Sequence, residues 1–223
     1  MKMSLSEFDK PYVNTYKLIA GVDEAGRGAL AGPVVAASVI LKSEIEGIND
    51  SKQLSPKKRD LLFEQIVENS IFSVGIATPE EIDVYNILNA TRMAMRRAVV
   101  AMKHKPKYLL IDGKNLSMEE YHGECIIEGD SKSASIAAAS ILAKVYRDRL
   151  MINLDMLYPE YCYASNKGYG TKKHLEAIKK YEPTIWHRLT FQPVRNCLNK
   201  KSTDEWLRIG VISKKRLFRC GYL

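Results

Sequence analysis

The stretch Gly21-Val-Asp-Glu-Ala-Gly-Arg-Gly-Ala-Leu-Ala-Gly-Pro33 decides the fold of this chain. It separates two apolar segments rich in β-branched residues, 16–22 and 34–41, which we predict to be strands joined by a loop. The first strand is expected to end in adjacent carboxylates, Asp23 and Glu24, which repel each other and are costly to bury. A solvated strand end would account for them, but the loop that follows favours a functional site.

That loop contains Gly26, Arg27 and Gly28. Glycines let a ligand approach the peptide groups, and the guanidinium of Arg27 matches the geometry of a phosphate. Carboxylates that gather a divalent metal, next to a loop able to contact a polyanion, indicate phosphodiester chemistry.

The composition fits a soluble globular protein with one good-sized domain and a small C-terminal appendage, since 46% of its 223 residues are apolar and 27% are charged. The longest apolar run, residues 30–41, is too short to span a bilayer, and the N-terminus lacks the pattern of a signal peptide. Four scattered cysteines without a Cys-x-x-Cys pair are typical of reduced thiols in the cytosol. We expect a cytoplasmic, monomeric protein without a membrane partner.

The net charge is +8, from 34 Lys and Arg against 26 Asp and Glu. Residues 200–223 carry seven basic and two acidic residues, so a surplus of five positive charges lies in this segment. Such asymmetry indicates a polyanionic partner, most simply nucleic acid. A solvated tail kept soluble by its charge is the alternative, and charge alone does not separate the two.

Beyond residue 41, turn residues and apolar periodicity predict alternating elements of an α/β fold. We expect strands over 71–77, 107–112 and 121–128, and helices over 56–68, 86–103, from about 131 to 157, after Thr171 and over 203–209. Two sets of residues are expected to face the core: Leu61, Leu62, Phe63 and Ile66 in the first of these helices, and Ile136, Ala139, Ala143 and Tyr146 in the long one.

Two more acids adjoin these elements: Asp112 ends a predicted strand and Asp130 precedes the long helix. A structural strand-end Asp and a helix N-cap are the alternatives for them. With Asp23 and Glu24 they make four hard oxygen ligands without a histidine or cysteine cluster, which suits Mg²⁺ or Mn²⁺ rather than zinc. A two-metal site would hold its ions roughly 4 Å apart.

Residues 165–174 form a basic, glycine-rich turn with one aromatic, Tyr169. We interpret Tyr169 as a side chain that stacks on a sugar or base, with an ordinary loop before a helix as the alternative. Asp148, between two arginines, is expected to form a helix-surface salt bridge. The four histidines are isolated in the sequence and are expected to be structural: His104, His122, His174 and His187.

The glycine-rich loops and the acids described above resemble those of the type 2 ribonucleases H, the ribonuclease HII family. The resemblance covers nearly all of residues 16–195. Its motifs follow the family's order: Gly21-Val-Asp-Glu-Ala-Gly-Arg-Gly, Asp50-Ser-Lys-Gln-Leu, Asn86-Ile-Leu-Asn-Ala-Thr, Ile111-Asp-Gly, Gly129-Asp-Ser, Ala138-Ala-Ser-Ile-Leu-Ala-Lys144 and Lys167-Gly-Tyr-Gly-Thr171. It implies an RNase H-like fold with a mixed central sheet flanked by helices and a small helical C-terminal extension. The implied divisions are a lead-in over 1–15, a catalytic domain with substrate-binding helices over 16–199 and a basic tail over 200–223.

The resemblance also implies a metal-dependent hydrolase that cuts the RNA strand of RNA–DNA hybrids. It would incise 5′ to single ribonucleotides in duplex DNA, leaving 3′-hydroxyl and 5′-phosphate ends, as in ribonucleotide excision repair. The implied catalytic acids, which would bind Mg²⁺ or Mn²⁺, are Asp23, Glu24, Asp112 and Asp130. The implied nucleic-acid contacts are Gly26, Arg27 and Gly28 at the ribose 2′-hydroxyl and adjacent phosphate, Tyr169 at the RNA–DNA junction and Lys52 at a phosphate.

Two departures from the family stand out. Ala29 occupies a position where proline is common, which is expected to loosen the loop. Residues after 199 match nothing assignable, so whether they add affinity or recruit a replication partner is open.

Two other functions compete with this interpretation. A non-catalytic nucleic-acid-binding module would explain the basic charge but not four acids placed near strand ends, which repel phosphate unless a metal bridges them. Another RNase H-like nuclease, such as a resolvase, would need the acids but not the Gly-Arg-Gly loop with Tyr169. Cleavage of an all-DNA duplex would support the latter.

Overall fold

The computed structural model describes residues 4–48 and 55–222. Its contacts divide the chain into two compact units, each built from three segments. The first unit comprises Met1–Ala25, Val35–Ile76 and Thr91–Tyr146, and the second comprises Gly26–Val34, Ala77–Ala90 and Arg147–Leu223.

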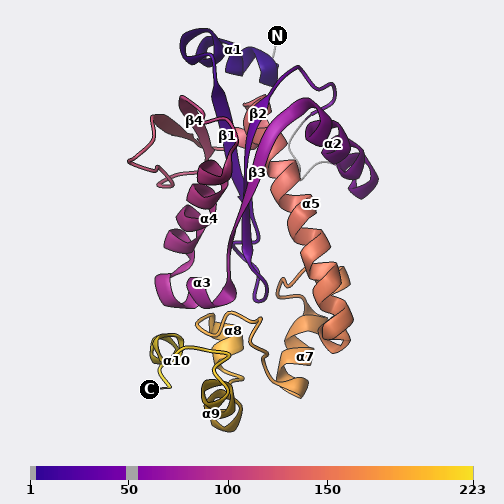
Figure 1. Ribbon diagram of the computed structural model, residues 1–223. Helices are drawn as coiled ribbons and strands as arrows, with labels where there is room; N and C mark the ends of the chain where they lie inside the picture. The colour runs from indigo at the N-terminus through magenta and orange to yellow at the C-terminus, as the bar shows by residue number, and fades with distance from the viewer. Residues whose placement is uncertain (1–3, 49–54, 223) are drawn as a thin grey trace. The chain divides into compact units, whose positions relative to one another are not determined.

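The first unit contains a mixed five-stranded sheet in the order β3-β2-β1-β4-β5 (Figure 1). β1 (Ile19–Ala25) runs antiparallel to β2 (Val34–Leu41) and parallel to β4 (Tyr108–Asp112), which is parallel to β5 (Gly123–Ile126). β3 (Ser70–Ala77) lies at the other edge. The prediction of a mixed central sheet is confirmed.

The placement of Asp23 and Glu24 differs from the prediction. β1 starts three residues later than expected and continues to Ala25, where it pairs with Val35 of β2. The two acids therefore lie inside the strand, because pairing with β2 extends it past the point where the apolar pattern stops.

Helices cover both faces of this sheet (Figure 1). On one face, Ala37 and Val39 of β2 pack in a buried cluster with α2 (Pro56–Asn69) and α5 (Ala134–Leu157). On the other face, Ser38 hydrogen-bonds to the sulfur of Met102, just beyond α4 (Ile87–Ala101). The alternation of residues 37, 38 and 39 between the two helical layers is the expected behaviour of a strand buried on both sides.

Two predicted core positions are wrong. Leu61 is 62% exposed, because the inner face of α2 is formed by Leu62 and Ile66, which lie four residues apart on the same side of the helix. Tyr146 is 40% exposed, since the packing of α5 against the sheet of the first unit ends at Val145.

The N-terminal segment that we expected to be a polar lead-in forms helix α1 (Leu5–Tyr16). A capping box starts it: the Ser4 hydroxyl accepts a hydrogen bond from the Glu7 amide, and the Glu7 carboxylate accepts one from the Ser4 amide. Tyr16 stacks on Tyr108 of β4 with ring centroids 4.1 Å apart. The segment is therefore an integral part of the first unit.

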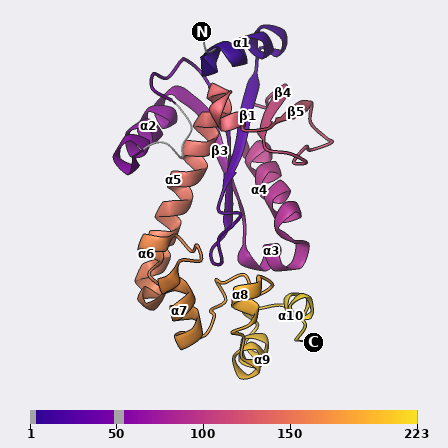
Figure 2. The same ribbon diagram turned by 180° about the vertical axis from the view of Figure 1, so that it is seen from behind.

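The second unit is mainly helical (Figure 2). Its helices are the C-terminal part of α5, α3 (Pro79–Tyr85), α6 (Tyr163–Asn166), α7 (Lys172–Tyr181), α8 (Gln192–Arg195), α9 (Lys200–Arg208) and α10 (Lys214–Cys220). Their core includes Met151, Tyr161 and Leu189, and also Cys220 and the partly buried Trp206 from beyond residue 199. The C-terminal extension is thus helical and contributes to the core of this unit.

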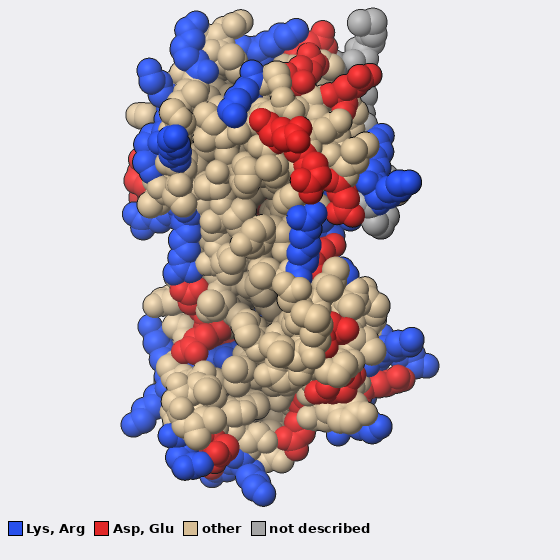
Figure 3. All heavy atoms as spheres, turned by 45° about the vertical axis from the view of Figure 1, so that its right-hand side comes forward, with Lys and Arg blue, Asp and Glu red and all other residues tan. Residues whose placement is uncertain are grey.

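The surface charge is mixed on the face shown in Figure 3, where acidic side chains lie among the lysines and arginines of each unit. Among the described residues, no helix combines the length and apolar character needed to cross a membrane.

Candidate functional site

Asp23 and Asp112 come from neighbouring parallel strands. Val22 of β1 is in register with Ile111 of β4. Asp23 and Asp112 are the next residues of the two strands, so they lie at the same level of the sheet. The Asp23 side chain is only 4% exposed. Burial, and then the charges of Glu24 and Asp112, raise the pKa of Asp23 well above its ordinary value. Three of the predicted acids therefore interact electrostatically at one place.

Asp130 is connected to this group through its neighbour. The amide of Gly129 donates a hydrogen bond of 2.6 Å to Oδ1 of Asp112, and Asp130 itself is 3% exposed in the short 3₁₀ turn Gly129–Ser131. The N-cap explanation of Asp130 is wrong, because α5 begins only at Ala134 and the Ser133 hydroxyl accepts from the amide of Ile136.

This donor set fits a hard divalent cation. Buried carboxylates raise one another's pKa when nothing offsets their charge, and a bound cation reverses that effect. In the described part of the chain, no three Asp, Glu, His or Cys side chains converge closely enough to chelate one ion as they stand.

The Gly26–Gly28 loop belongs to the second unit and is held from inside by Arg188. The Arg188 guanidinium donates to the carbonyl oxygens of Gly26, at 2.5 Å, Arg27, at 2.6 Å, and Gly32, at 3.1 Å. Arg188 is completely buried, and burial, followed by the charge of Arg147, lowers its pKa to about 9.

This arrangement turns the amides of the loop outward. In a trans peptide, the C=O of one residue and the N–H of the next point in opposite directions. Because the carbonyls of Gly26 and Arg27 point at Arg188, the N–H groups of Arg27 and Gly28 point away from it, and both residues are exposed. The peptide N–H groups of Arg27 and Gly28 therefore lie on the side of the loop away from the buried cation.

Arg147 joins the same segment to Tyr169. Its guanidinium donates to the carbonyls of Ala31, Pro33 and Lys167 and lies 5.4 Å from the centre of the Tyr169 ring. A side chain at Gly26 would collide with Arg147, since a Cβ there would lie 2.0 Å from its Nε, and Gly26 has a φ of +96°. Tyr169 itself is 36% exposed.

Ala29 does not loosen the loop as we expected. It is completely buried, and its amide donates a 3.3 Å hydrogen bond to the carbonyl of Gly26. Proline lacks that donor, so alanine closes the turn with a bond that proline could not form.

The sequence did not indicate Arg147 and Arg188, because each lies in an ordinary helical or apolar run and acts on carbonyls far away in the chain. The expectation that His174 and His187 are isolated is also wrong, since their Nε2 atoms are 3.2 Å apart. Lys52 lies outside the described residues.

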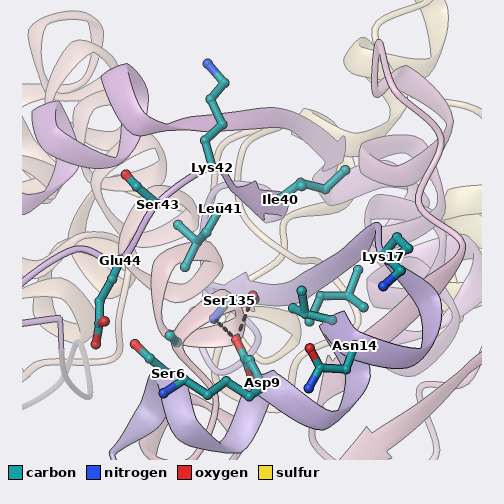
Figure 4. Close-up of a pocket in the computed structure, with 14 residues that line it drawn as sticks. Ser6, Asp9, Asn14, Lys17, Ile40, Leu41, Lys42, Ser43, Glu44 and Ser135 are labelled. Atoms are coloured by element: carbon teal, nitrogen blue, oxygen red, sulfur yellow. Dashed lines mark hydrogen bonds between the residues drawn. The ribbon is translucent and has the colours of Figure 1, made fainter.

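A cavity of about 280 Å³ lies in the first unit between α1, the end of β2 and the start of α5 (Figure 4). Asp9 lines it and accepts hydrogen bonds from the amide and hydroxyl of Ser135, at 2.8 and 2.7 Å. Burial raises the pKa of Asp9 above its ordinary value, and hydrogen bonds from Ser133 and Ser135 offset only part of that rise. Asp9 thus ties α1 to the first turn of α5, close in sequence to Asp130.

Comparisons with known proteins identify the family of the chain. The family model of ribonuclease HII matches residues 20–194. The chain belongs to the ribonuclease HII family. It is 50% identical to the ribonuclease HII of Thermotoga maritima over 211 residues, which are 95% of this chain and 88% of that protein. With the ribonuclease HII of Clostridioides difficile it shares 55% identity over 183 residues, covering 81% of this chain and 72% of that one.

The crystal structure of ribonuclease H2 from Pyrococcus horikoshii OT3 superposes with a TM-score of 0.67 at 29% identity, covering 80% of this chain and 96% of that one. The RNase H-like fold is therefore confirmed. As a member of this family, the protein is a ribonuclease H, an enzyme class that acts on RNA–DNA hybrids.

Proposed function

We propose that this member of the ribonuclease HII family is a metal-dependent endonuclease that cuts the RNA strand of hybrids. We propose that it also incises 5′ to a single ribonucleotide in duplex DNA, leaving 3′-hydroxyl and 5′-phosphate ends. The observation that carries the proposal is the outward orientation of the Arg27 and Gly28 amides, fixed by Arg188. Below, Gly26–Gly28 is called the reading loop.

The reading loop suits the one feature that distinguishes a ribonucleotide within DNA. A 2′-hydroxyl oxygen accepts hydrogen bonds, and a peptide N–H reaches it only where no side chain intervenes. Gly28 is exposed and has no side chain, and the exposed Arg27 guanidinium has the fork geometry for the neighbouring phosphate. Buried Arg188 adds positive charge behind the loop, which favours an anionic ligand.

The acids supply the other half of the proposal. Asp23, Glu24, Asp112 and Asp130 would hold Mg²⁺ or Mn²⁺, and a bound pair of such ions activates the attacking water and stabilises the leaving oxygen. The chain orients Asp112 through the Gly129 amide and buries Asp23 and Asp130 away from bulk water. Only Ala25 separates Glu24 from the reading loop, so recognition and chemistry are neighbours in the sequence.

Cleavage of a duplex with one embedded ribonucleotide tests the proposal, with Mg²⁺, Mn²⁺ or EDTA and an all-DNA duplex as control. We expect a single metal-dependent nick 5′ to the ribonucleotide and an intact control. A nick in the all-DNA duplex would favour a different RNase H-like nuclease. Absence of cleavage with either metal would leave a nucleic-acid-binding protein.

Replacing Tyr169 by Ala is expected to lower incision at a single ribonucleotide by about tenfold to a hundredfold, because stacking of one base on an aromatic ring contributes about 1–3 kcal/mol. Cleavage of a long hybrid should fall less, since every sugar of its RNA strand offers a 2′-hydroxyl. The two rates are compared as kcat/KM. Tyr181→Ala, at another exposed tyrosine of the second unit, is the control, and an equal loss on both substrates would contradict the junction role of Tyr169.

A further inference from the structure

Two buried histidines form a hydrogen-bonded chain that ends at the backbone of Tyr169. His174 and His187 are each completely buried, and their Nε2 atoms lie 3.2 Å apart. His174 Nδ1 lies 2.9 Å from the carbonyl oxygen of Tyr169, and His187 Nδ1 lies 2.9 Å from the amide nitrogen of Thr184.

These contacts fix the proton on each ring. A carbonyl oxygen only accepts, so His174 carries its proton on Nδ1. A backbone amide only donates, so Nδ1 of His187 is the acceptor and its proton is on Nε2. His187 Nε2–H then faces two acceptors at 3.2 Å, Nε2 of His174 and the hydroxyl oxygen of Tyr163. Burial lowers the pKa of both rings, that of His187 to about 3, so both are neutral at pH 7.

The hydrogen-bonded histidines connect the two parts of the proposed recognition surface, the reading loop and Tyr169. His187 immediately precedes Arg188, whose guanidinium holds the carbonyls of the reading loop, and it forms a β-bridge with Ala31. His174 holds Tyr169, whose carbonyl oxygen also accepts from the amide of Thr171. The carbonyl is thus fixed by two donors.

We infer that His174 is a positioning residue that fixes Tyr169 relative to the reading loop, and that His187 selects the tautomer of His174 required for this. The inference rests on the proposed function, because it assigns a purpose to the position of Tyr169. Neither histidine touches substrate in this assignment.

Two variants of His174 separate positioning from packing. The amide nitrogen of Asn can occupy the place of Nδ1, whereas the amide of Gln reaches the place of Nε2. We expect His174→Asn to retain most of the preference for a single ribonucleotide over a long hybrid. His174→Gln should reduce that ratio of kcat/KM values by roughly tenfold, as expected when a contacting group is misplaced. His104→Gln, at an exposed histidine, is the control.

The outcomes distinguish this inference from the proposed function. If Tyr169→Ala changes the substrate ratio but His174→Gln and His174→Asn do not differ, the inference is overturned and the function stands. If Tyr169→Ala leaves the ratio unchanged, the recognition role of Tyr169 fails, and the inference fails with it.

A measurement on the wild-type protein covers the case in which a variant does not fold. Nitrogen-15 NMR of the histidine rings in the full chain at pH 7 should show His174 protonated on Nδ1 and His187 on Nε2, both neutral. The opposite tautomer at His174 would exclude the hydrogen bond to Tyr169 and overturn the inference.

Discussion

Asp112→Asn should lower cleavage by about a thousandfold or more, while duplex binding survives. The substitution keeps the size of the side chain and the Oδ1 atom that accepts from the Gly129 amide at 2.6 Å, but it removes the negative charge proposed to bind metal. Single-turnover cleavage with Mg²⁺ measures the first effect, and fluorescence anisotropy of the labelled duplex in EDTA measures the second. Cleavage at the wild-type rate would show that Asp112 is not a metal ligand.

Stability adds an independent test of the same assignment. The charge of Asp112 raises the pKa of buried Asp23, so removing it relieves repulsion in the metal-free protein. A gain of about 1 kcal/mol would raise the melting temperature by about 2–4 °C. Mg²⁺ should then stabilise the wild type more than the variant, since a ligand stabilises only the form that binds it. Glu119→Gln, an exposed acid of the same unit, should change neither property.

Arg216→Ala is expected to destabilise the protein by about 3–5 kcal/mol, because it leaves a buried carboxylate without its cation. Arg216 Nε lies 2.8 Å from Asp83 Oδ2, and the two side chains are 2% and 0% exposed. Arg216 Nη2 also donates to the carbonyls of Ile185 and His187. Urea unfolding of the variant measures the loss.

Arg219→Ala is the matched control, since Arg219 is exposed on the same helix and should change stability by no more than about 0.5 kcal/mol. The double variant Asp83→Asn/Arg216→Ala should be less destabilised than the sum of the single variants, because the two side chains interact directly. Equal effects of Arg216→Ala and Arg219→Ala would show that the salt bridge does not anchor α10.

The buried salt bridge also bears on the charge of the C-terminal segment. Because Arg216 is paired with Asp83 inside the protein, the net charge of this segment overstates the positive charge available to bind a polyanion.

Elements with local signals could be predicted from the sequence. β2 has its predicted bounds. The helices start where cap residues stand in the sequence: the side chains of Ser55, Thr78 and Thr171 each accept a hydrogen bond from the amide three residues later. These features depend on side chains a few residues apart, which the sequence displays directly. The capping box at Ser4 was equally visible and was missed because the segment is polar.

The support beneath the candidate site could not be predicted in this way. Arg147 and Arg188 are identified by the carbonyls that they contact, and those carbonyls belong to residues whose side chains carry no information about them. The pairing of His174 with His187 likewise depends on how α7 folds back, which periodicity within each segment does not reveal. The acids were found because carboxylates near apolar strands are unusual on their own.

The bond between Arg188 and the carbonyl of Arg27 has a consequence for synthesis of the protein. The two residues are 161 positions apart, so the reading loop leaves the ribosome long before the side chain that holds it exists. At about 5–20 residues per second the delay is roughly 10–30 s. Arg216, which completes the same unit, is made later still. We therefore expect a nascent chain to remain without nuclease activity until translation has passed these arginines.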